Sequence, residues 1–302
     1  MPTIELPQGA VNYRVAGPED SASPPVVFVH GLLADGALWS GVADLLAARG
    51  VRSYAPDWPL GAHRIALRPD ADQSPRGVAA QILALLDELD LTGVTLVGND
   101  TGGALCQFLV DTDASRVGRL VLTNCDAFDA FPPALFRPAF ALLRSERRAK
   151  FLAGQLRPRW LRHSWMGFGL LAKNLPADLT RSWIEPARTD PGVRRDAVRF
   201  LRAIEPRELL EVSTRLDRFD GPVSIVWGAA DHAFTTKLGK RLQQAFTDAT
   251  FVSVPRSRTF VPLDAPMALA DEIVAIAAPG RAESGADSPR AGASDGEAGS
   301  RS

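Results

Sequence analysis

The sequence predicts an α/β fold, in which a mostly parallel sheet is flanked by helices and interrupted by one inserted helical segment. Short, continuous apolar runs typical of buried strands, such as residues 26–29 and 94–97, alternate with stretches of helical periodicity. From about residue 127 to 216 this alternation stops, and a segment rich in Arg, Leu, Trp and Phe takes its place. Hydrophobic residues make up 46% of the 302 residues, which is enough for a sizeable core.

The expected elements follow one another along the chain in a regular order. Strands are expected at residues 11–15, 26–29, 51–55, 94–97, 120–122, 223–227 and 250–254. Helices are expected at residues 41–49, 75–89, 102–110, 238–245 and 266–277. The start of the second helix has the clearest chemistry, because Ser74 can cap it and Pro75 suits the first helical position. We therefore expect a core of residues 1–126 and 217–277, a helical lid of residues 127–216, and a disordered tail of residues 278–302, which has almost no apolar side chains.

The overall charge and the cysteines exclude several classes of protein. A net charge of −1 gives no reason to expect a nucleic acid or a membrane as partner. There is no run of 18 apolar residues and no basic-then-apolar start, so neither a membrane span nor a signal peptide is expected. Cys106 and Cys125 fit neither a disulfide framework nor a metal-binding pattern. We expect a cytoplasmic protein without a cofactor or metal, and the oligomeric state stays open.

One motif indicates chemistry. Gly98-Asn99-Asp100-Thr101-Gly102 lies between an expected strand and an expected helix, which is the nucleophile-elbow pattern with Asp in place of Ser. Glycines are needed there because the turn is sharp, and the helix N-terminus stabilises an anion.

Further residues agree with this motif. His30-Gly31 follows an early strand, and Trp227-Gly228-Ala229-Ala230-Asp231 follows a late one. Over residues 10–277 the sequence resembles the α/β-hydrolase fold family, and its closest pattern is the Asp-nucleophile branch of haloalkane dehalogenases and epoxide hydrolases. The resemblance implies that Asp100 attacks an sp³ carbon as nucleophile or serves as a base. It also implies that the backbone N–H groups of Leu32 and Thr101 form an oxyanion hole and that Asp231 is the acid.

The sequence departs from this family at the catalytic histidine. Residues 260–266 match the family stretch that follows this histidine, so that Thr259 stands at its position. Threonine cannot act as a general base near neutral pH, so hydrolysis of an ester on Asp100 is expected to be slow. His63 or His163 is a candidate replacement, although each is more often a surface or packing histidine.

Other departures disfavour both named activities. Leu32 and Thr101 stand where dehalogenases have halide-binding Asn and Trp, and the only tyrosines, Tyr13 and Tyr54, precede the segment that supplies epoxide hydrolases with their proton donors. Asp126 and Asp129 compete with Asp231 for the role of acid, because they also follow a strand. The residues expected to form the substrate pocket are His30, Trp39, Trp160, His163 and Trp165.

The leading hypothesis is an enzyme that uses Asp100 on a small or medium apolar substrate of the ester, halide or epoxide class. One alternative is a catalytically lapsed member that binds a ligand or partner. The other is a non-hydrolytic enzyme that uses Asp100 as an acid or base.

Overall fold

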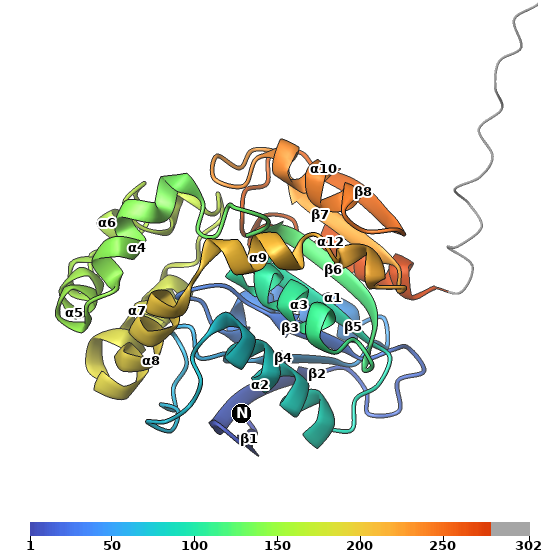
Figure 1. Ribbon diagram of the computed structural model, residues 1–302, viewed down its shortest axis with the longest axis horizontal. Coiled ribbons are helices and arrows are strands. Elements are labelled where there is room, and N and C mark those ends of the chain that lie inside the picture. Colours follow the sequence, from blue (N-terminus) through green and yellow to red (C-terminus); the bar gives the residue numbers. More distant parts are fainter. Residues whose placement is uncertain (279–302) are drawn as a thin grey trace, which may run out of the picture.

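A sheet of eight strands runs through the described part of the chain, which is residues 1–278 of a computed structural model (Figure 1). The strands are β1 (Thr3–Leu6), β2 (Gly9–Ala16), β3 (Val26–Val29), β4 (Ser53–Pro56), β5 (Val94–Asp100), β6 (Val117–Cys125), β7 (Val223–Gly228) and β8 (Ala249–Val254). Their spatial order is β1-β2-β4-β3-β5-β6-β7-β8. β2 is antiparallel to both of its neighbours, and all other neighbouring strands are parallel.

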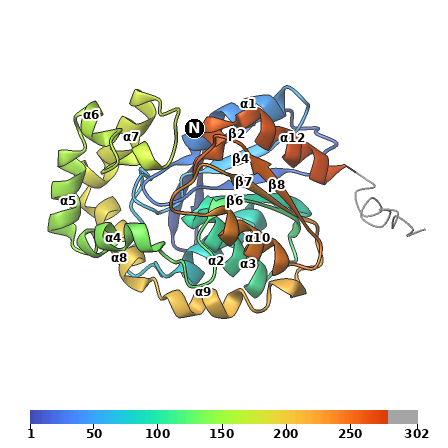
Figure 2. The ribbon, with the colours of Figure 1, turned by 90° about the horizontal axis from the view of Figure 1, so that it is seen from above.

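Helices cover both faces of the sheet (Figure 2). One face carries α1 (Ser40–Ala47) and α12 (Pro266–Ala277), which pack against each other. The other face carries α2 (Pro75–Glu88), α3 (Thr101–Thr112), α9 (Pro206–Val212) and α10 (Thr236–Gln244). Short helical turns complete the core: η1 (Gly36–Trp39), η4 (Leu216–Arg218) and α11 (Val261–Asp264).

Successive side chains of a strand point to opposite faces of the sheet, so the apolar core is divided into two clusters. In β3, Val27 and Val29 belong to the cluster beneath α2 and α3, whereas Val26 and Phe28 belong to the cluster beneath α1 and α12. All four side chains are buried because both faces are covered, which explains why the strand reads as a continuous apolar run.

The helix start at Ser74 has the predicted chemistry. The Ser74 hydroxyl accepts a hydrogen bond from the backbone N–H of Gly77, and Pro75 is the first residue of α2. β1 was not among the expected strands. It has only four residues and is held by its hairpin with β2, a partner that sequence periodicity does not reveal.

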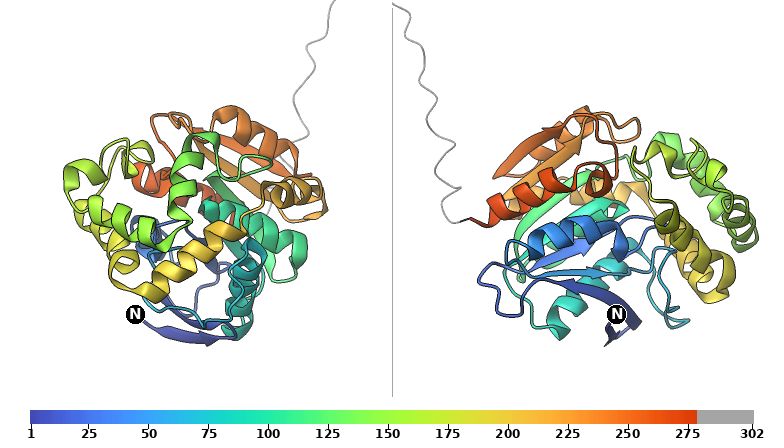
Figure 3. Two further views of the ribbon diagram at one scale, coloured as in Figure 1. Left: turned by 60° about the vertical axis from the view of Figure 1, so that its left-hand side comes forward. Right: turned by 180° about the vertical axis from the view of Figure 1, so that it is seen from behind.

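The segment between β6 and β7 begins with a group of helices that stands to one side of the sheet (Figures 1 and 3). They are η2 (Ala134–Phe136), α4 (Arg137–Leu143), α5 (Glu146–Gln155), α6 (Arg159–Arg162), η3 (Phe168–Leu170), α7 (Ala177–Thr189) and α8 (Pro191–Ala203). α9 lies within the range expected for the lid, yet its residues Leu209 and Val212 are buried in the same cluster as α3. Packing against the core therefore resumes before residue 217.

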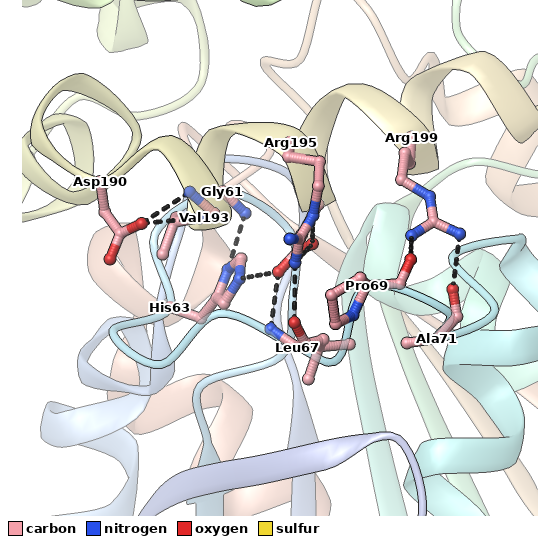
Figure 4. Close-up of polar contacts among 11 residues, drawn as sticks. Gly61, His63, Leu67, Pro69, Ala71, Asp190, Val193, Arg195 and Arg199 are labelled. Carbon is pink, nitrogen blue, oxygen red and sulfur yellow. Dashed lines mark hydrogen bonds and ion pairs between the residues drawn. The ribbon is translucent and has the colours of Figure 1, made fainter.

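A polar network ties α8 to the loop that follows β4 (Figure 4). The buried carboxylate of Asp196 accepts hydrogen bonds from the Leu67 N–H at 2.7 Å, from His63 Nε2 at 3.4 Å, and from the Arg195 guanidinium. Arg195 also donates to the Leu67 carbonyl, and Arg199 donates to the carbonyls of Pro69 and Ala71. We call this set of contacts the α8 strap.

The structure describes the chain as far as residue 278. The tail expected to be disordered begins at residue 278, and residues 279–302 lie outside the described residues. Among residues 1–278, no helix has the length and apolar character needed to span a membrane.

Candidate active site

Asp100 is the last residue of β5 and directly precedes α3. Its backbone has φ 55° and ψ −132°, a conformation that residues other than glycine rarely adopt. Such strain costs about 1–3 kcal/mol and persists only where the surroundings enforce it. The elbow therefore lifts the Asp100 side chain out of the strand and presents it at the N-terminus of α3.

Glycines around Asp100 leave the space that this turn needs. A Cβ on Gly102 would lie 2.1 Å from the Val29 carbonyl oxygen, and a Cβ on Gly103 would lie 2.3 Å from the Cys125 Cβ. A Cβ on Gly31 would lie 2.0 Å from Oδ2 of Asp100 itself. The loop after β3 can approach the carboxyl group this closely only because residue 31 has no side chain.

The backbone N–H groups of Leu32 and Thr101 face the carboxyl group of Asp100 and act to lower its pKa. Burial, helped by the charge of Asp231, nevertheless raises its pKa from 3.8 to about 7, against the opposing effect of these N–H groups. The pKa of Asp100 is therefore raised towards neutral pH. The structure brings together Asp100, Leu32 and Thr101, the three residues that the elbow and the loop after β3 were expected to assemble.

Asp231 and Thr259 are in direct contact. Thr259 Oγ1 donates a 2.7 Å hydrogen bond to Asp231 Oδ2, which also accepts one from Asn124 at 2.9 Å. Asp231 Oδ1 accepts from the backbone N–H groups of Ala233 and Phe234. Burial raises the pKa of Asp231 despite these donors, of which Thr259 has the largest opposing effect.

A second carboxyl group, that of Asp126, lies beside Asp100. Its Oδ2 accepts a 3.1 Å hydrogen bond from Thr101 Oγ1, whereas its Oδ1 is buried and has no hydrogen-bond partner within residues 1–278. Burial, followed by the charge of Asp100, raises its pKa well above the usual value. Asp129, its neighbour in the sequence, is exposed and pairs with Arg241, so it does not contribute to this site.

Asp100 and Asp126 both line a cavity of about 490 Å³. Most of the wall is apolar, and it comes from the loop after β3 and from the helical insertion: Leu32, Leu33, Phe136, Leu143, Leu152, Leu156, Leu161, Phe168, Leu171, Ile184, Val198 and Leu201. Besides the two aspartates, the charged residue on this wall is Arg194 of α8. The cavity therefore presents two carboxyl groups with raised pKa values to a largely apolar space.

Within residues 1–278, no histidine lines this cavity. His30 is buried beneath the loop after β3, where Nε2 accepts from the Trp58 N–H and Nδ1 donates to the Gly31 carbonyl. His63 is occupied in the α8 strap (Figure 4), and His163 hydrogen-bonds to Thr180 at 2.8 Å. His232 is exposed. The structure thus places neither His63 nor His163 where the family histidine would stand.

The residues expected to form the substrate pocket are dispersed. Trp165 lines the cavity, but Trp39 is buried in the core, stacked on Phe28 with ring centroids 4.6 Å apart. Trp160 is 74% exposed and lies outside the cavity wall, as do His30 and His163. Four of the five expected pocket residues therefore have other positions: two in the core, one at the surface and one within the insertion.

Three residues of the site were not identified from the sequence. Asn124 holds Asp231 and Gly228, and Asn99 donates a 2.7 Å hydrogen bond to the Thr259 carbonyl. A signal for both existed, because each is a polar residue at the carboxyl end of an otherwise apolar strand. Arg194 had no comparable signal, because its helix carries several arginines and only the fold shows which of them turns inward.

Comparison with known proteins agrees with the fold. The family model described as "alpha/beta hydrolase fold" matches residues 24–266. Haloalkane dehalogenase 2 of Mycobacterium tuberculosis is 24% identical over 281 residues, which cover 86% of this chain and 90% of that protein. An uncharacterized protein of Mycobacterium tuberculosis is 31% identical over 137 residues, but the match spans 45% of this chain and only 38% of that protein. A non-heme chloroperoxidase of Streptomyces lividans is 28% identical over 139 residues, or 45% of this chain and 47% of that protein.

Solved structures share the same architecture. An alpha/beta hydrolase fold protein from Burkholderia ambifaria superposes with a TM-score of 0.73 at 22% identity, covering 91% of this chain and 97% of its own. An ancestral haloalkane dehalogenase gives a TM-score of 0.73 at 20% identity, covering 91% of this chain and 99% of its own. At these identities the likeness establishes the fold.

Proposed function

Because the chain belongs to the alpha/beta hydrolase fold family, we propose that it is an enzyme that uses Asp100 as a nucleophile on a small or medium apolar substrate of the ester, halide or epoxide class. The observation that carries this proposal is the position of the Asp100 carboxyl group. It sits on a strained elbow, faces the N–H groups of Leu32 and Thr101, and borders an apolar cavity of about 490 Å³.

The proposed reaction begins with the carboxylate form of Asp100. With an alkyl halide, an Asp100 oxygen attacks the carbon, the carbon–halogen bond breaks, and the halide leaves with the bonding electrons. The product is an ester on Asp100, whose other oxygen remains at the N–H groups of Leu32 and Thr101. These same groups would stabilise the oxyanion that forms when water attacks that ester.

The helical insertion supports the choice of an apolar substrate. Its residues supply most of the cavity wall, and we propose that it acts as a lid that keeps water from the reacting carbon. Leu135 and Met166 line the cavity and are also exposed, so they mark its opening.

The second half of the reaction is where this site departs from its relatives. Thr259 donates a hydroxyl hydrogen bond to Asp231, and we propose that it stands in the place of the family histidine, so that attack of water on the ester lacks a general base. We propose that Asp126, whose pKa is raised by burial, is a proton donor to the leaving group. The ester on Asp100 should then form faster than it is hydrolysed.

Mass spectrometry of the intact protein tests this proposal. The protein is incubated separately with a 1-haloalkane, a terminal epoxide and a short-chain ester, and the mass added by each is measured and mapped by peptide analysis. A stoichiometric adduct on Asp100 is expected, and Asp100→Asn should remove it. An adduct elsewhere, or none with any of the three classes, would reject Asp100 as a nucleophile.

A second candidate function follows from the protonation of the site. With a pKa of about 7, Asp100 can exchange a proton near neutral pH, which suits an acid or base in an elimination or cyclisation. In that case no adduct forms, but a bound substrate exchanges a carbon-bound hydrogen for deuterium in heavy water, and Asp100→Asn abolishes the exchange. Ligand binding without adduct or exchange would identify a catalytically lapsed binding protein.

A further inference from the structure

The outer helices of the insertion carry a concentration of positive charge that the overall net charge of −1 conceals. Residues 137–163 contain one acidic residue, Glu146, and eight basic residues: Arg137, Arg144, Arg147, Arg148, Lys150, Arg157, Arg159 and Arg162. All eight lie in or beside α4, α5 and α6, the part of the insertion farthest from the sheet (Figures 1 and 2).

Most of this charge is not neutralised by the protein. Arg162 is buried and bonds to backbone carbonyls, and Arg137 and Arg144 also donate to carbonyls. The other five, which we call the cationic face, are exposed and form no ion pair with any residue from 1 to 278: Arg147, Arg148, Lys150, Arg157 and Arg159. A surface that leaves so many cations unpaired is suited to an anionic partner.

The cationic face contains a hollow of about 450 Å³. Four cations border it, namely Arg147, Lys150 and Arg157 of the cationic face and Arg188 of α7. Arg188 is engaged by Glu185, which leaves the other three available. Guanidinium and ammonium groups gathered around a concave space provide the donors that a phosphate group requires.

Large apolar side chains are exposed beside these cations. Phe151 is 64% exposed and borders the hollow, and Trp160 and Trp165 are each 74% exposed. Trp165 also lines the apolar cavity above Asp100, and Gln155 borders both the hollow and that cavity. Phe151, Gln155 and Trp165 thus place the hollow and the wall of the cavity next to each other in the insertion.

We propose that this side of the insertion docks on an anionic phospholipid bilayer. Cations attract the phosphates of the headgroups, while Phe151, Trp160 and Trp165 enter the apolar interface. A nucleic acid would satisfy the cations but leave these three side chains and the cavity opening without a role. Docking of this kind needs no membrane-spanning helix, and none is found among residues 1–278.

Docking would connect the bilayer with the apolar cavity. Trp165 and Met166 lie at the cavity opening, so an apolar molecule dissolved in the bilayer could reach Asp100 without crossing water. The docking itself does not depend on the chemistry of Asp100, and the two proposals can fail separately.

Co-sedimentation with vesicles tests the proposal on the full chain. Vesicles of phosphatidylglycerol and phosphatidylcholine mixed equally are compared with vesicles of phosphatidylcholine alone, at low and at high salt. We expect binding to the anionic vesicles that weakens as salt rises. The variant Arg147→Glu/Lys150→Glu should bind at least about tenfold more weakly, because each basic residue near an anionic surface adds to the attraction.

The matched control is a double charge reversal at another exposed site. Lys237→Glu/Lys240→Glu reverses two exposed lysines with the same spacing on α10, on the opposite side of the molecule (Figure 1), and should bind as the wild type does. Asp100→Asn should also bind vesicles normally, which separates docking from reaction.

Tryptophan fluorescence tests the apolar part of the contact. Trp39, Trp58, Trp183 and Trp227 are buried, so a blue shift on addition of anionic vesicles reports Trp160 and Trp165. Trp160→Phe/Trp165→Phe should remove the shift while retaining sedimentation. The proposal would be overturned by equal binding to both vesicle types, by tighter binding to duplex DNA than to vesicles, or by equal losses of binding in the two charge-reversal variants. Full displacement by millimolar glycerol phosphate would also overturn it, because that result indicates a site for a free phosphate.

Discussion

The Thr259 hydroxyl donates a 2.7 Å hydrogen bond to Asp231, so the carboxyl group of Asp231 orients a side chain that cannot accept a proton from water. Asn124 and two backbone N–H groups also donate hydrogen bonds to Asp231, so its carboxyl group is held from several sides. If Thr259 stands in the place of the family histidine, as proposed, the site lacks a base that activates water.

Restoring that base should restore turnover. Thr259→His places an imidazole next to Asp231, and general-base assistance is typically worth about 10²–10⁴-fold. We expect hydrolysis of the Asp100 ester to accelerate by a factor in this range, measured as the decay of the adduct mass with time. Thr259→Val, which has a similar size but no hydrogen-bonding group, is the control and should not accelerate decay. Rapid multiple turnover by the wild type would show that another group already activates water.

Adduct formation should depend on pH through Asp100. Only its carboxylate form is nucleophilic, and its pKa is raised to about 7, so the rate should rise as the pH increases from 5 and level off above 8. The measurement is the initial rate of adduct formation with a haloalkane in buffers of constant ionic strength. A rate already constant from pH 5 upward would indicate a carboxylate with an ordinary pKa and would contradict the buried position of Asp100.

Burial of Asp100 should also make stability depend on pH. Its pKa is higher in the folded state, so folding is favoured at low pH and loses free energy as the pH rises from about 4 to about 7. A rise from 3.8 to about 7 corresponds to roughly 4 kcal/mol at most. Asp100→Asn should therefore have a larger free energy of unfolding than the wild type at pH 8 and a similar one at pH 4, by urea denaturation. Asp220→Asn, at an exposed position, should leave the wild-type profile unchanged.

Replacing Asp126 should slow adduct formation most for substrates with poor leaving groups. If its protonated form donates to the departing oxygen, Asp126→Asn should slow adduct formation with an epoxide by about 10²-fold or more. An alkyl iodide, whose leaving group needs no proton, should react with Asp100 at nearly the wild-type rate. Asp129→Asn is the neighbouring control, because Asp129 is exposed. Equal losses for both substrates would indicate that Asp126 only shapes the site.

The α8 strap should contribute strongly to stability. Asp196 is buried and accepts from the Leu67 N–H, His63 and Arg195, so Asp196→Ala leaves a buried cluster of donors without an acceptor (Figure 4). We expect a loss of about 3–5 kcal/mol in the free energy of unfolding. Arg199→Ala removes more exposed contacts of the same strap and should cost about 1 kcal/mol or less.

The sequence was sufficient to predict those features that depend only on residues close to one another in the chain. The elbow could be identified because Gly98, Asp100 and Gly102 are fixed by one turn, and the start of α2 because Ser74 and Pro75 act within that turn. The strand at Val26–Val29 was evident because coverage of both faces makes it continuously apolar.

The pocket could not be predicted in the same way. A tryptophan in the inserted segment is equally suited to a cavity wall, a core or a surface, and Trp165, Trp183 and Trp160 occupy these three positions in turn. The choice depends on how the helices pack, which no short segment encodes. The pairing of Asp126 with Thr101 likewise joins two strand ends that are distant in sequence.

The α8 strap has a consequence for exchanging parts between relatives. The contacts of Asp196, Arg195 and Arg199 reach residues 63–71, which lie in sequence long before the insertion begins. A chimera that receives only the helical insertion from another member of the family would lose the acceptors and donors on which α8 rests. The unit that can be transplanted is therefore discontinuous in sequence, and it comprises the insertion together with the loop after β4.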